Sequence, residues 1–493
     1  MNLRFVLHML GIVEIFLGLG MLISSLWGYY YSDGSSNVMI LCGGCSFLLG
    51  IALFFAFRQF DELVTVRSAV FLVVAAWLVA VFTGSLPYFV ARIFGRYSGA
   101  SFINSLFESV SGFSTTGASV LGDPYPIEKV GKAILFWRQM TQWIGGLGII
   151  LMVISVFPLF GASGLAIVKA ESFGLSLNKI QPRMITTVRS FGLVYLLITF
   201  IFIGFYLLGG LPVFDAMSIT MAGLATGGFL HRDASIAAYG SSYVEWVTIA
   251  LMFVSATNFM LHYSAIVGRI NAYFKSSEFR FYLFWLLSAS TIVVVSLYRS
   301  DVAKGFSSVG ELVRSAVFQT VSLSSATGFV TKDFDGWPNG VRVIFLILML
   351  FGGCLGSTSG GIKMFRLLLV IKSIFREIKR TLHPSLFVGV RYDGEVVHRN
   401  ILDGVYTFFA LYILIVLFAT ASLSLLGLDF TSSFSAVVTT MGGVGPGLGS
   451  VGPVKNFFYV PPLGKIILIM CMLFGRLEII PLIAVVSPSF WRK

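Results

Sequence analysis

Apolar runs long enough to cross a bilayer fill most of the chain, and short polar stretches that contain glycine separate many of them. Two apolar runs come first, at residues 5–27 and 37–57. A pattern then recurs four times: an apolar run, a short amphipathic helix, a glycine-containing loop and a second apolar run. Because a membrane-spanning helix needs about 20 apolar residues, this pattern predicts ten spans and four short helices between them.

The four copies have comparable lengths, which indicates internal pseudo-symmetry. Their loop glycines, Gly117, Gly227, Gly328 and Gly445, are separated by 110, 101 and 117 residues. The predicted fold is an all-α polytopic membrane protein, with four pseudo-symmetric helix–pore loop–helix repeats around one pore and two additional N-terminal transmembrane helices. The second apolar runs of the copies are residues 134–160, 244–267, 341–365 and 463–486. We divide the chain into residues 1–66 for the N-terminal helices and 67–185, 186–275, 276–390 and 391–493 for pore repeats 1 to 4.

The composition agrees with a membrane protein. Of 493 residues, 57% are hydrophobic and only 11% are charged, and the mean hydropathy is +0.90, whereas about a quarter of the residues of a soluble domain are charged. The net charge of +12 is not a nucleic-acid footprint, because most Lys and Arg residues lie in alternate loops. This distribution predicts that both termini are cytoplasmic and that all four loops enter from the outside. The four cysteines lie in or beside apolar stretches, so no zinc or redox site is expected.

The first loop indicates a pore. Residues 107–117 read Phe-Glu-Ser-Val-Ser-Gly-Phe-Ser-Thr-Thr-Gly, and non-helical backbone of this kind is tolerated at membrane depth only against protein or water. Rings of carbonyl oxygens can replace the hydration shell of a monovalent cation, glycine permits the backbone angles that this requires, and the C-terminal end of each short helix favours a cation. From the residues alone, the ligand is a dehydrated monovalent cation. The expected filter residues are Thr115, Thr116 and Gly117; Ala225, Thr226 and Gly227; Ala326, Thr327 and Gly328; and Gly443, Val444 and Gly445.

Two further features lie in the second halves of the last two repeats. Residues 352–361 interrupt an apolar run with five glycines and four Ser, Thr or Cys residues. We expect an intramembrane loop in the pore beneath the filter, with a packing kink as the alternative. Arg476 lies in the last apolar run, where a charge is costly and usually faces the bundle interior. A positive barrier in the pore is favoured, and an ion pair with Glu478 is the alternative.

These motifs resemble the TrkH/TrkG–KtrB family of potassium-uptake channels over the whole chain. The resemblance rests on residues 111–117, 225–229, 326–329, 352–363, 443–447 and 475–478, which occur in the family's order. It implies K+ preference, because this family has a glycine in each filter loop and Ser in the first loop goes with sodium preference. The chain departs from many relatives at Gly443, where they often have Asn. The resemblance also implies a gate that consists of Gly352, Gly353, Gly356, Ser357, Gly360, Gly361 and Arg476.

The same resemblance implies gated K+ uptake across a bacterial inner (plasma) membrane by a homodimer with one pore per subunit. It implies regulation by a TrkA-like cytosolic subunit that binds NAD(H) and ATP or ADP. No nucleotide motif occurs in this chain, so nucleotides are expected on that partner. The basic stretch 363–399 is expected to meet anionic membrane lipids. No nucleic acid, and no cofactor other than K+ as the transported ion, is expected.

Two other functions remain as alternatives. A Na+- or H+-coupled K+ symporter would use an intramembrane carboxylate pair or relay, and none stands out in the sequence. An integral-membrane enzyme would need Asp, Glu or His residues clustered at one membrane face, whereas the histidines are scattered: His8, His231, His262, His383 and His398. We therefore expect an ion channel or transporter and not an enzyme.

Overall fold

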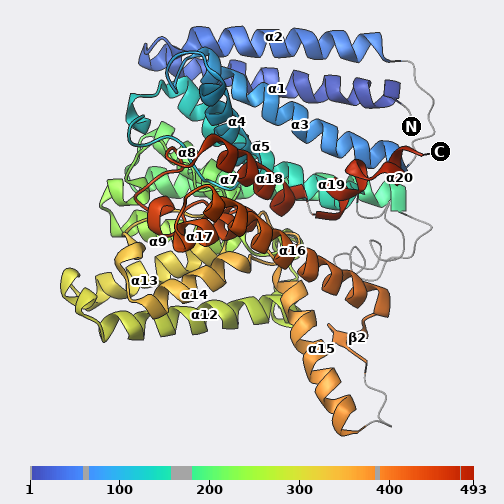
Figure 1. Ribbon diagram of the computed structural model, residues 1–493, viewed down its shortest axis with the longest axis vertical. Coiled ribbons are helices and arrows are strands. Elements are labelled where there is room, and N and C mark those ends of the chain that lie inside the picture. Colours follow the sequence, from blue (N-terminus) through green and yellow to red (C-terminus); the bar gives the residue numbers. More distant parts are fainter. Residues whose placement is uncertain (1–2, 59–65, 157–179, 384–388, 478, 493) are drawn as a thin grey trace.

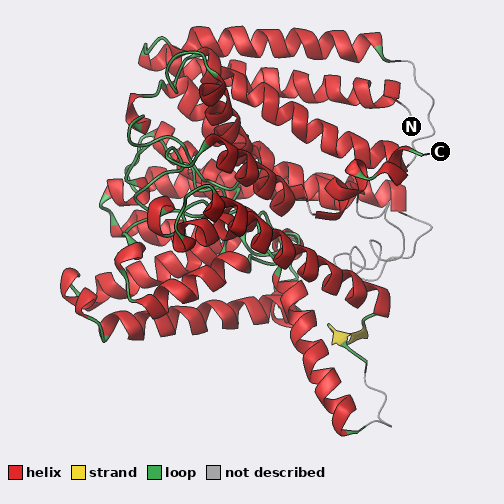
Figure 2. Ribbon diagram, in the orientation of Figure 1, coloured by secondary structure: helices red, strands yellow, loops and turns green. Residues whose placement is uncertain are grey.

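The computed structural model describes residues 3–58, 66–156, 180–383, 389–477 and 479–492, and these are almost entirely helical (Figures 1 and 2). Helices α1 (Leu3–Tyr31) and α2 (Ser35–Ala56) form a hairpin at one edge of the molecule. Glycines meet where they pack: a Cβ on Gly18 would lie 2.7 Å from the carbonyl oxygen of Gly43. Small residues let membrane helices approach this closely. The two predicted N-terminal helices are therefore confirmed.

Each repeat contains the predicted short helix after its long first helix, and the all-helical polytopic fold is confirmed. Three of the short helices begin at a residue whose side chain accepts a bond from a backbone amide of the first turn: Ser98 from Ser101, Ser308 from Glu311 and Asp429 from Ser432. The helices of the repeats are α3 (Val66–Val90), α4 (Gly99–Phe113) and α5 (Lys132–Val156); α7 (Ile180–Leu208), α8 (Val213–Leu224), α9 (Ser242–Ser255), α10 (Phe259–Ile266) and α11 (Asn271–Lys275); α12 (Ser277–Tyr298), α13 (Val309–Ser324), α14 (Asn339–Leu350) and α15 (Met364–Leu382); and α16 (Arg399–Leu425), α17 (Phe430–Gly442), α18 (Pro462–Leu477), α19 (Ile479–Val486) and α20 (Pro488–Trp491).

Short elements complete the loops. A two-residue hairpin pairs β1 (Arg391–Tyr392) with β2 (Glu395–Val396), and its turn is Asp393-Gly394, with both φ angles positive. An Asp-Gly pair favours such a turn. The 3-10 helices are η1 (Ile127–Lys129), η4 (Ser235–Tyr239), η5 (Asp301–Gly305), η6 (Phe334–Gly336) and η7 (Gly449–Val451).

The second run of the second repeat differs from the expected uninterrupted span. Among the described residues, six helices are long and apolar enough to cross a membrane, and they are α1, α2 and the first helix of each repeat. Residues 244–267 were expected as one span and instead form α9 and α10, which meet at 99°. Counting that pair as one span gives seven candidate spans, while residues 157–160 of the expected span 134–160 lie outside the described residues. The third repeat is interrupted between α14 and α15, as its glycines predict. The break between α9 and α10 and the break between α14 and α15 lie side by side, so non-helical backbone of the second and third repeats meets there.

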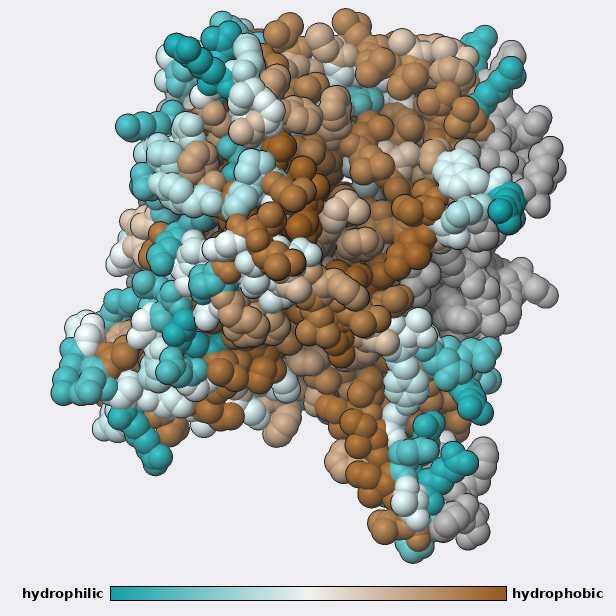
Figure 3. Space-filling model, in the orientation of Figure 1, coloured by the Kyte–Doolittle hydropathy of each residue, from teal (hydrophilic) through white to brown (hydrophobic). Residues whose placement is uncertain are grey.

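The surface separates into apolar and polar zones. Hydrophobic residues cover the middle of the view in Figure 3, and hydrophilic residues gather at the two ends of the helices. Figure 1 shows both chain termini at the same end, and α15 extends from the body near β2. This distribution is that of a bundle whose helix sides face lipid.

Candidate ion pathway

The four short helices α4, α8, α13 and α17 end in the same hydrogen-bonded turn, of the Schellman type. One residue in each turn is left-handed: Thr115 (φ 53°), Thr226 (53°), Ala326 (59°) and Gly443 (69°). The next amide donates to the carbonyl five residues earlier in every case: Thr116 N to Ser111 O (2.9 Å), Gly227 N to Ala222 O (2.8 Å), Thr327 N to Ser322 O (2.9 Å) and Val444 N to Thr439 O (2.9 Å).

Two of the left-handed residues are strained. Threonine is β-branched, and a β-branched residue with a positive φ is a conformational outlier that costs on the order of 1–3 kcal/mol. Thr115 and Thr226 nevertheless adopt φ 53° within buried loops. Gly443 has no such cost, and Asn would also be accepted there, so the departure from the family pattern at Gly443 keeps the local conformation. Strain of this kind concentrates at functional segments.

The shared turn shows how the four loops correspond. Because Thr116 and Gly227 make equivalent hydrogen bonds, the counterpart of Gly117 in the second loop is Gly228. The sequence-based alignment of Gly227 with Gly117 is therefore wrong by one residue, since the second loop has adjacent glycines and spacing alone gives no choice between them. The φ angles agree with the structural alignment: 77° at Gly117, 74° at Gly228, 77° at Gly328 and 98° at Gly445.

These four glycines form a closed ring of close contacts. At each one, an added Cβ would come too close to a carbonyl oxygen of the following loop, and the fourth loop meets the first. A side chain is therefore excluded at all four positions, and the four loops surround one axis. The contacts join Gly117 to Gly227 O, Gly228 to Thr327 O, Gly328 to Val444 O and Gly445 to Thr116 O.

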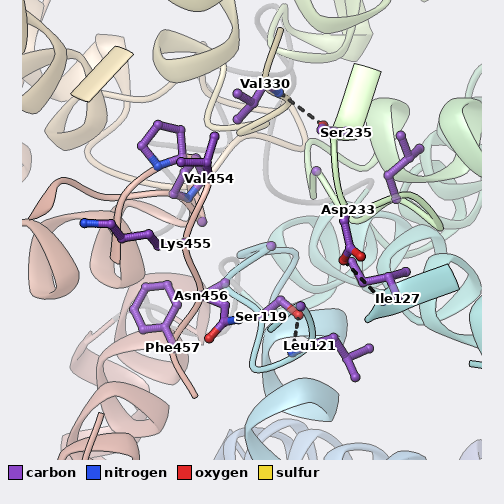
Figure 4. A pocket seen from close by; sticks show the side chains of 18 of the residues that line it. Ser119, Leu121, Ile127, Asp233, Ser235, Val330, Val454, Lys455, Asn456 and Phe457 are labelled. Atoms are coloured by element: carbon purple, nitrogen blue, oxygen red, sulfur yellow. Dashed lines mark hydrogen bonds between the residues drawn. The ribbon is translucent and has the colours of Figure 1, made fainter. Parts of the chain in front are cut away.

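A cavity of about 530 Å³ adjoins this ring and is lined by loops of all four repeats (Figure 4). The four ring glycines contribute to its lining. Asp233 and Lys455 are charged residues of its wall. The Asp233 carboxylate accepts a hydrogen bond from Ile127 N (3.2 Å). Burial, together with a hydrogen bond to Glu128, raises the pKa of Asp233 to about 6, and the same bond lowers the pKa of Glu128.

A buried ion pair supports the first and second loops. The Arg138 guanidinium on α5 donates from Nε to Glu108 of α4 (2.6 Å) and from Nη1 to Leu230 O (2.8 Å). Glu108 also accepts from the backbone amide of Val120 (3.0 Å). These contacts fix Glu108 against the loop that follows α4. Sequence reasoning missed Arg138, although an arginine inside an apolar run is itself a signal of a buried partner.

The interrupted segment between α14 and α15 packs on the break between α9 and α10. Cys354 N donates to Ala256 O (2.8 Å), and Phe259 N donates to Gly356 O (3.0 Å). Each broken segment thus supplies hydrogen-bond partners to backbone groups of the other that have no partner within a helix. Backbone at membrane depth requires such partners. Thr358 Oγ1 donates to Leu224 O (2.9 Å) at the end of α8. The segment therefore lies against the C-terminal end of this short helix.

The glycines predicted for the gate allow this packing. An added Cβ would overlap Gly360 O at Gly352, Ala256 O at Gly353 and Gly442 O at Gly360. Gly356 and Gly361 are left-handed, with φ of 71° and 69°. Ser357 Oγ donates to Cys354 O (2.5 Å). The contact with Gly442 places the segment next to the end of α17, which precedes the fourth loop.

Glu278 connects the middle of the same segment to the first turn of α15 and was not predicted from the sequence. Its Oε1 accepts from Leu355 N (2.7 Å) and from Phe365 N (2.8 Å). Glu278 lies in the first turn of α12 and is 3% exposed. Two amide donors on one carboxylate oxygen satisfy the buried charge in part.

Arg476 contacts this intramembrane segment directly. Its Nη1 donates to Thr358 O (2.7 Å), its Nη2 donates to Gly145 O (3.2 Å), and the residue is 3% exposed. Glu478, the alternative partner proposed from the sequence, lies outside the described residues. Within the part of the chain that the structure describes, Arg476 is held by backbone carbonyls and forms no ion pair.

Comparison with known proteins gives one consistent family. Residues 35–493 match the family model TrkH, described as a cation transport protein. The Trk system potassium uptake protein TrkH of Escherichia coli strain K12 is 33% identical over the full length of both chains, and TrkG of the same strain is 30% identical over 100% of this chain and 99% of its own. The crystal structure of the potassium transporter TrkH from Vibrio parahaemolyticus superposes with a TM-score of 0.89 at 31% identity, with 100% of both chains covered.

Proposed function

The chain belongs to the TrkH family of cation transport proteins, and on that premise we propose that it is the pore-forming subunit of a gated, K+-selective uptake system. It is a multi-pass membrane transporter and not an enzyme. K+ is the transported ion, as the names of the similar proteins from Escherichia coli and Vibrio parahaemolyticus suggest. The proposal assigns a separate task to each of two structural features, the ring of loops and the intramembrane segment.

The ring of four glycines is the observation that carries the proposal. Carbonyl oxygens from four loops converge where no side chain fits, and a dehydrated K+ needs such oxygens in place of water. The proposed filter consists of the residues expected from the sequence, with Gly228 added to the second loop. The four pore helices end at this ring, so their partially negative C-terminal ends favour a cation there.

The intramembrane segment, residues 351–363, is proposed as the gate. It packs against the C-terminal ends of α8 and α17, where these helices lead into the filter loops. Arg476 adds a positive charge to it, held by Thr358 O. In a region of low dielectric, an unneutralised positive charge near the path repels a cation strongly. Displacing this segment together with Arg476 would open the pore.

The remaining assignments follow from the family and the charge distribution. We propose that the protein works as a homodimer in a bacterial inner membrane, with both termini in the cytoplasm and the filter loops entering from outside. The basic surface of α15 is proposed to meet anionic lipids. A TrkA-like cytosolic subunit that binds NAD(H) and ATP or ADP is proposed to drive the gate from the same side.

Flux into liposomes tests the proposal. Purified protein reconstituted in vesicles should carry Rb+, a K+ analogue, down its electrochemical gradient without an imposed Na+ or H+ gradient. Adding the cytosolic subunit with its nucleotide should change the rate. Flux that requires a Na+ or H+ gradient would indicate a symporter instead of a channel. Absence of Rb+ flux in monodisperse protein would refute the transport function.

A further inference from the structure

Two of the four filter loops are braced by a hydrogen bond between two of their own side chains. In the first loop, Ser114 Oγ lies 2.7 Å from Thr116 Oγ1, and in the third, Ser325 Oγ lies 2.7 Å from Thr327 Oγ1. Each hydroxyl pair spans the left-handed residue and therefore ties the turn together. Such short hydroxyl contacts are hydrogen bonds.

The second loop lacks both members of this pair. The residues at the matching positions are Ala225 and Gly227, which carry no hydroxyl group. Gly227 has no side chain at all, and glycine is the residue with the greatest backbone freedom. Its carbonyl oxygen is nevertheless the atom that faces Gly117 across the ring. This loop needs a constraint from elsewhere in the chain.

Gln142, on α5, occupies the vacant space. Its Nε2 donates to Gly227 O (2.6 Å), and its Oε1 accepts from Phe229 N (3.0 Å). A Cβ on Gly227 would overlap the amide carbon of Gln142. The side chain is fully buried, and its orientation is set by its partners, because the amide nitrogen must face a carbonyl and the amide oxygen an N–H group.

We propose that Gln142 is a specificity-determining positioning residue, which supplies to the second filter loop the brace that the first and third loops carry in their own sequence. It bridges Gly227 and Phe229, which flank the ring glycine Gly228, so it restrains the backbone on both sides of that glycine. Selectivity depends on where the carbonyl oxygens are held and on their field strength. Gln142 acts on both, because it donates to one of those oxygens.

The neighbouring side chains of α5 separate this role from general packing. Arg138, one turn earlier, donates to Leu230 O beyond the ring and is paired with Glu108. Gln139 is also a fully buried glutamine of α5, yet neither of its amide atoms has a hydrogen-bond partner within the described residues. Gln139 is therefore a matched control for Gln142, with the same residue type, helix and burial.

The inference rests on the proposed K+ filter, and reversal potentials in K+/Na+ gradients test the two separately. In full-length protein reconstituted in bilayers, Gln142→Ala and Gln142→Met should lower the K+/Na+ permeability ratio roughly fivefold, the order expected for one hydrogen bond. Gln142→Met removes the amide donor and acceptor and fills most of their space with an unbranched apolar side chain, so it tests the bonds without a large cavity. Gln139→Ala should leave the ratio unchanged.

A compensating variant tests the space-filling argument. Gly227→Thr gives the second loop the residue of the first and third loops, but in the wild-type background the new side chain collides with Gln142. The triple variant Gln142→Ala/Ala225→Ser/Gly227→Thr supplies both hydroxyl groups of the pair and should recover selectivity relative to Gln142→Ala. A monodisperse Gln142→Met protein with the wild-type permeability ratio, or a triple variant no more selective than Gln142→Ala, would overturn the inference. A wild-type protein that conducts without preferring K+ would instead overturn the proposed filter, and this inference with it.

Discussion

The guanidinium of Arg476 donates to the carbonyl oxygen of Thr358 at 2.7 Å, so the last repeat is bonded to the intramembrane segment of the third. The second nitrogen of the same group reaches Gly145 O in the first repeat at 3.2 Å. One buried cation thus connects three repeats at the base of the ring of loops. A residue with this placement can hold the segment in position and repel cations at the same time.

Replacing Arg476 by Gln should increase basal Rb+ flux about tenfold, because hydrogen bonds from a charged group are worth about 1.5–3 kcal/mol and the positive barrier is also lost. Arg476→Lys retains the charge and should raise the flux less. The measurement is Rb+ entry into liposomes without the cytosolic subunit. If the Gln variant is folded and its basal flux equals that of the wild type, Arg476 has no part in the gate.

Substitution at Gly117 should relax K+/Na+ discrimination. Gly117→Ser introduces a Cβ that overlaps Gly227 O and changes the spacing of the first and second loops. The structural alignment predicts an equivalent effect for Gly228→Ser, which meets Thr327 O. Reversal potentials in mixed K+ and Na+ should shift toward the value for an unselective pore in both variants.

Gly148→Ala is the control for these substitutions, because nothing lies within 4 Å of an added Cβ there and its φ is not positive. Its permeability ratio should match that of the wild type. Unaltered selectivity in Gly228→Ser, beside a loss in Gly117→Ser, would show that the structural alignment of the second loop is incorrect.

Cation entry should depend on pH through Asp233. Its pKa of about 6 is raised above the usual value by burial and by the hydrogen bond to Glu128, with Arg138 acting in the opposite direction. Above pH 6 the carboxylate is charged and attracts K+ to the cavity, and below pH 6 it is protonated and the attraction is lost. K+ flux at low ionic strength should therefore fall roughly twofold from pH 7.5 to pH 5, since a single charge is moderately screened.

The Asp233→Asn variant isolates this effect. It should show the low-pH flux at every pH and a flat profile through pH 6, because its amide does not titrate. High salt should flatten the wild-type profile as well. A wild-type profile that persists in Asp233→Asn would assign the titration to another group.

The pair formed by Glu108 and Arg138 should contribute strongly to stability. Both side chains are at most 1% exposed, and removal of one member of a buried pair leaves an uncompensated charge that costs about 3–5 kcal/mol. Glu108→Ala should therefore lower the Tm in detergent clearly. The matched control is Asp301→Ala, which breaks an exposed pair with Lys304 and should leave the Tm almost unchanged. If the Tm of Glu108→Ala equalled that of Asp301→Ala, the structural role of Glu108 would be contradicted.

Much of the architecture could be predicted because it depends on local patterns. A long run of apolar residues indicates a helix in contact with lipid. Glycine in a polar stretch between such runs indicates non-helical backbone at membrane depth. The N-terminal pair of helices, the short helix in each repeat and the break at residues 352–361 are all of this kind. The 99° bend between α9 and α10 was not predicted, although Ser255, Thr257 and Asn258 lie at the break, because the hydrogen bonds that satisfy its backbone come from the segment of the third repeat.

By itself, the sequence determined that the chain is a helical membrane protein with four related loops, since composition and periodicity act within a few turns of helix. Only the tertiary structure decided which glycine of the second loop belongs to the ring, that Gln142 lies behind that loop, and which carbonyl Arg476 bonds. These three depend on contacts between positions far apart in the chain, up to 331 residues for Arg476 and Gly145. Burial makes such partners obligatory for polar groups, but it leaves their identity to the way the repeats pack.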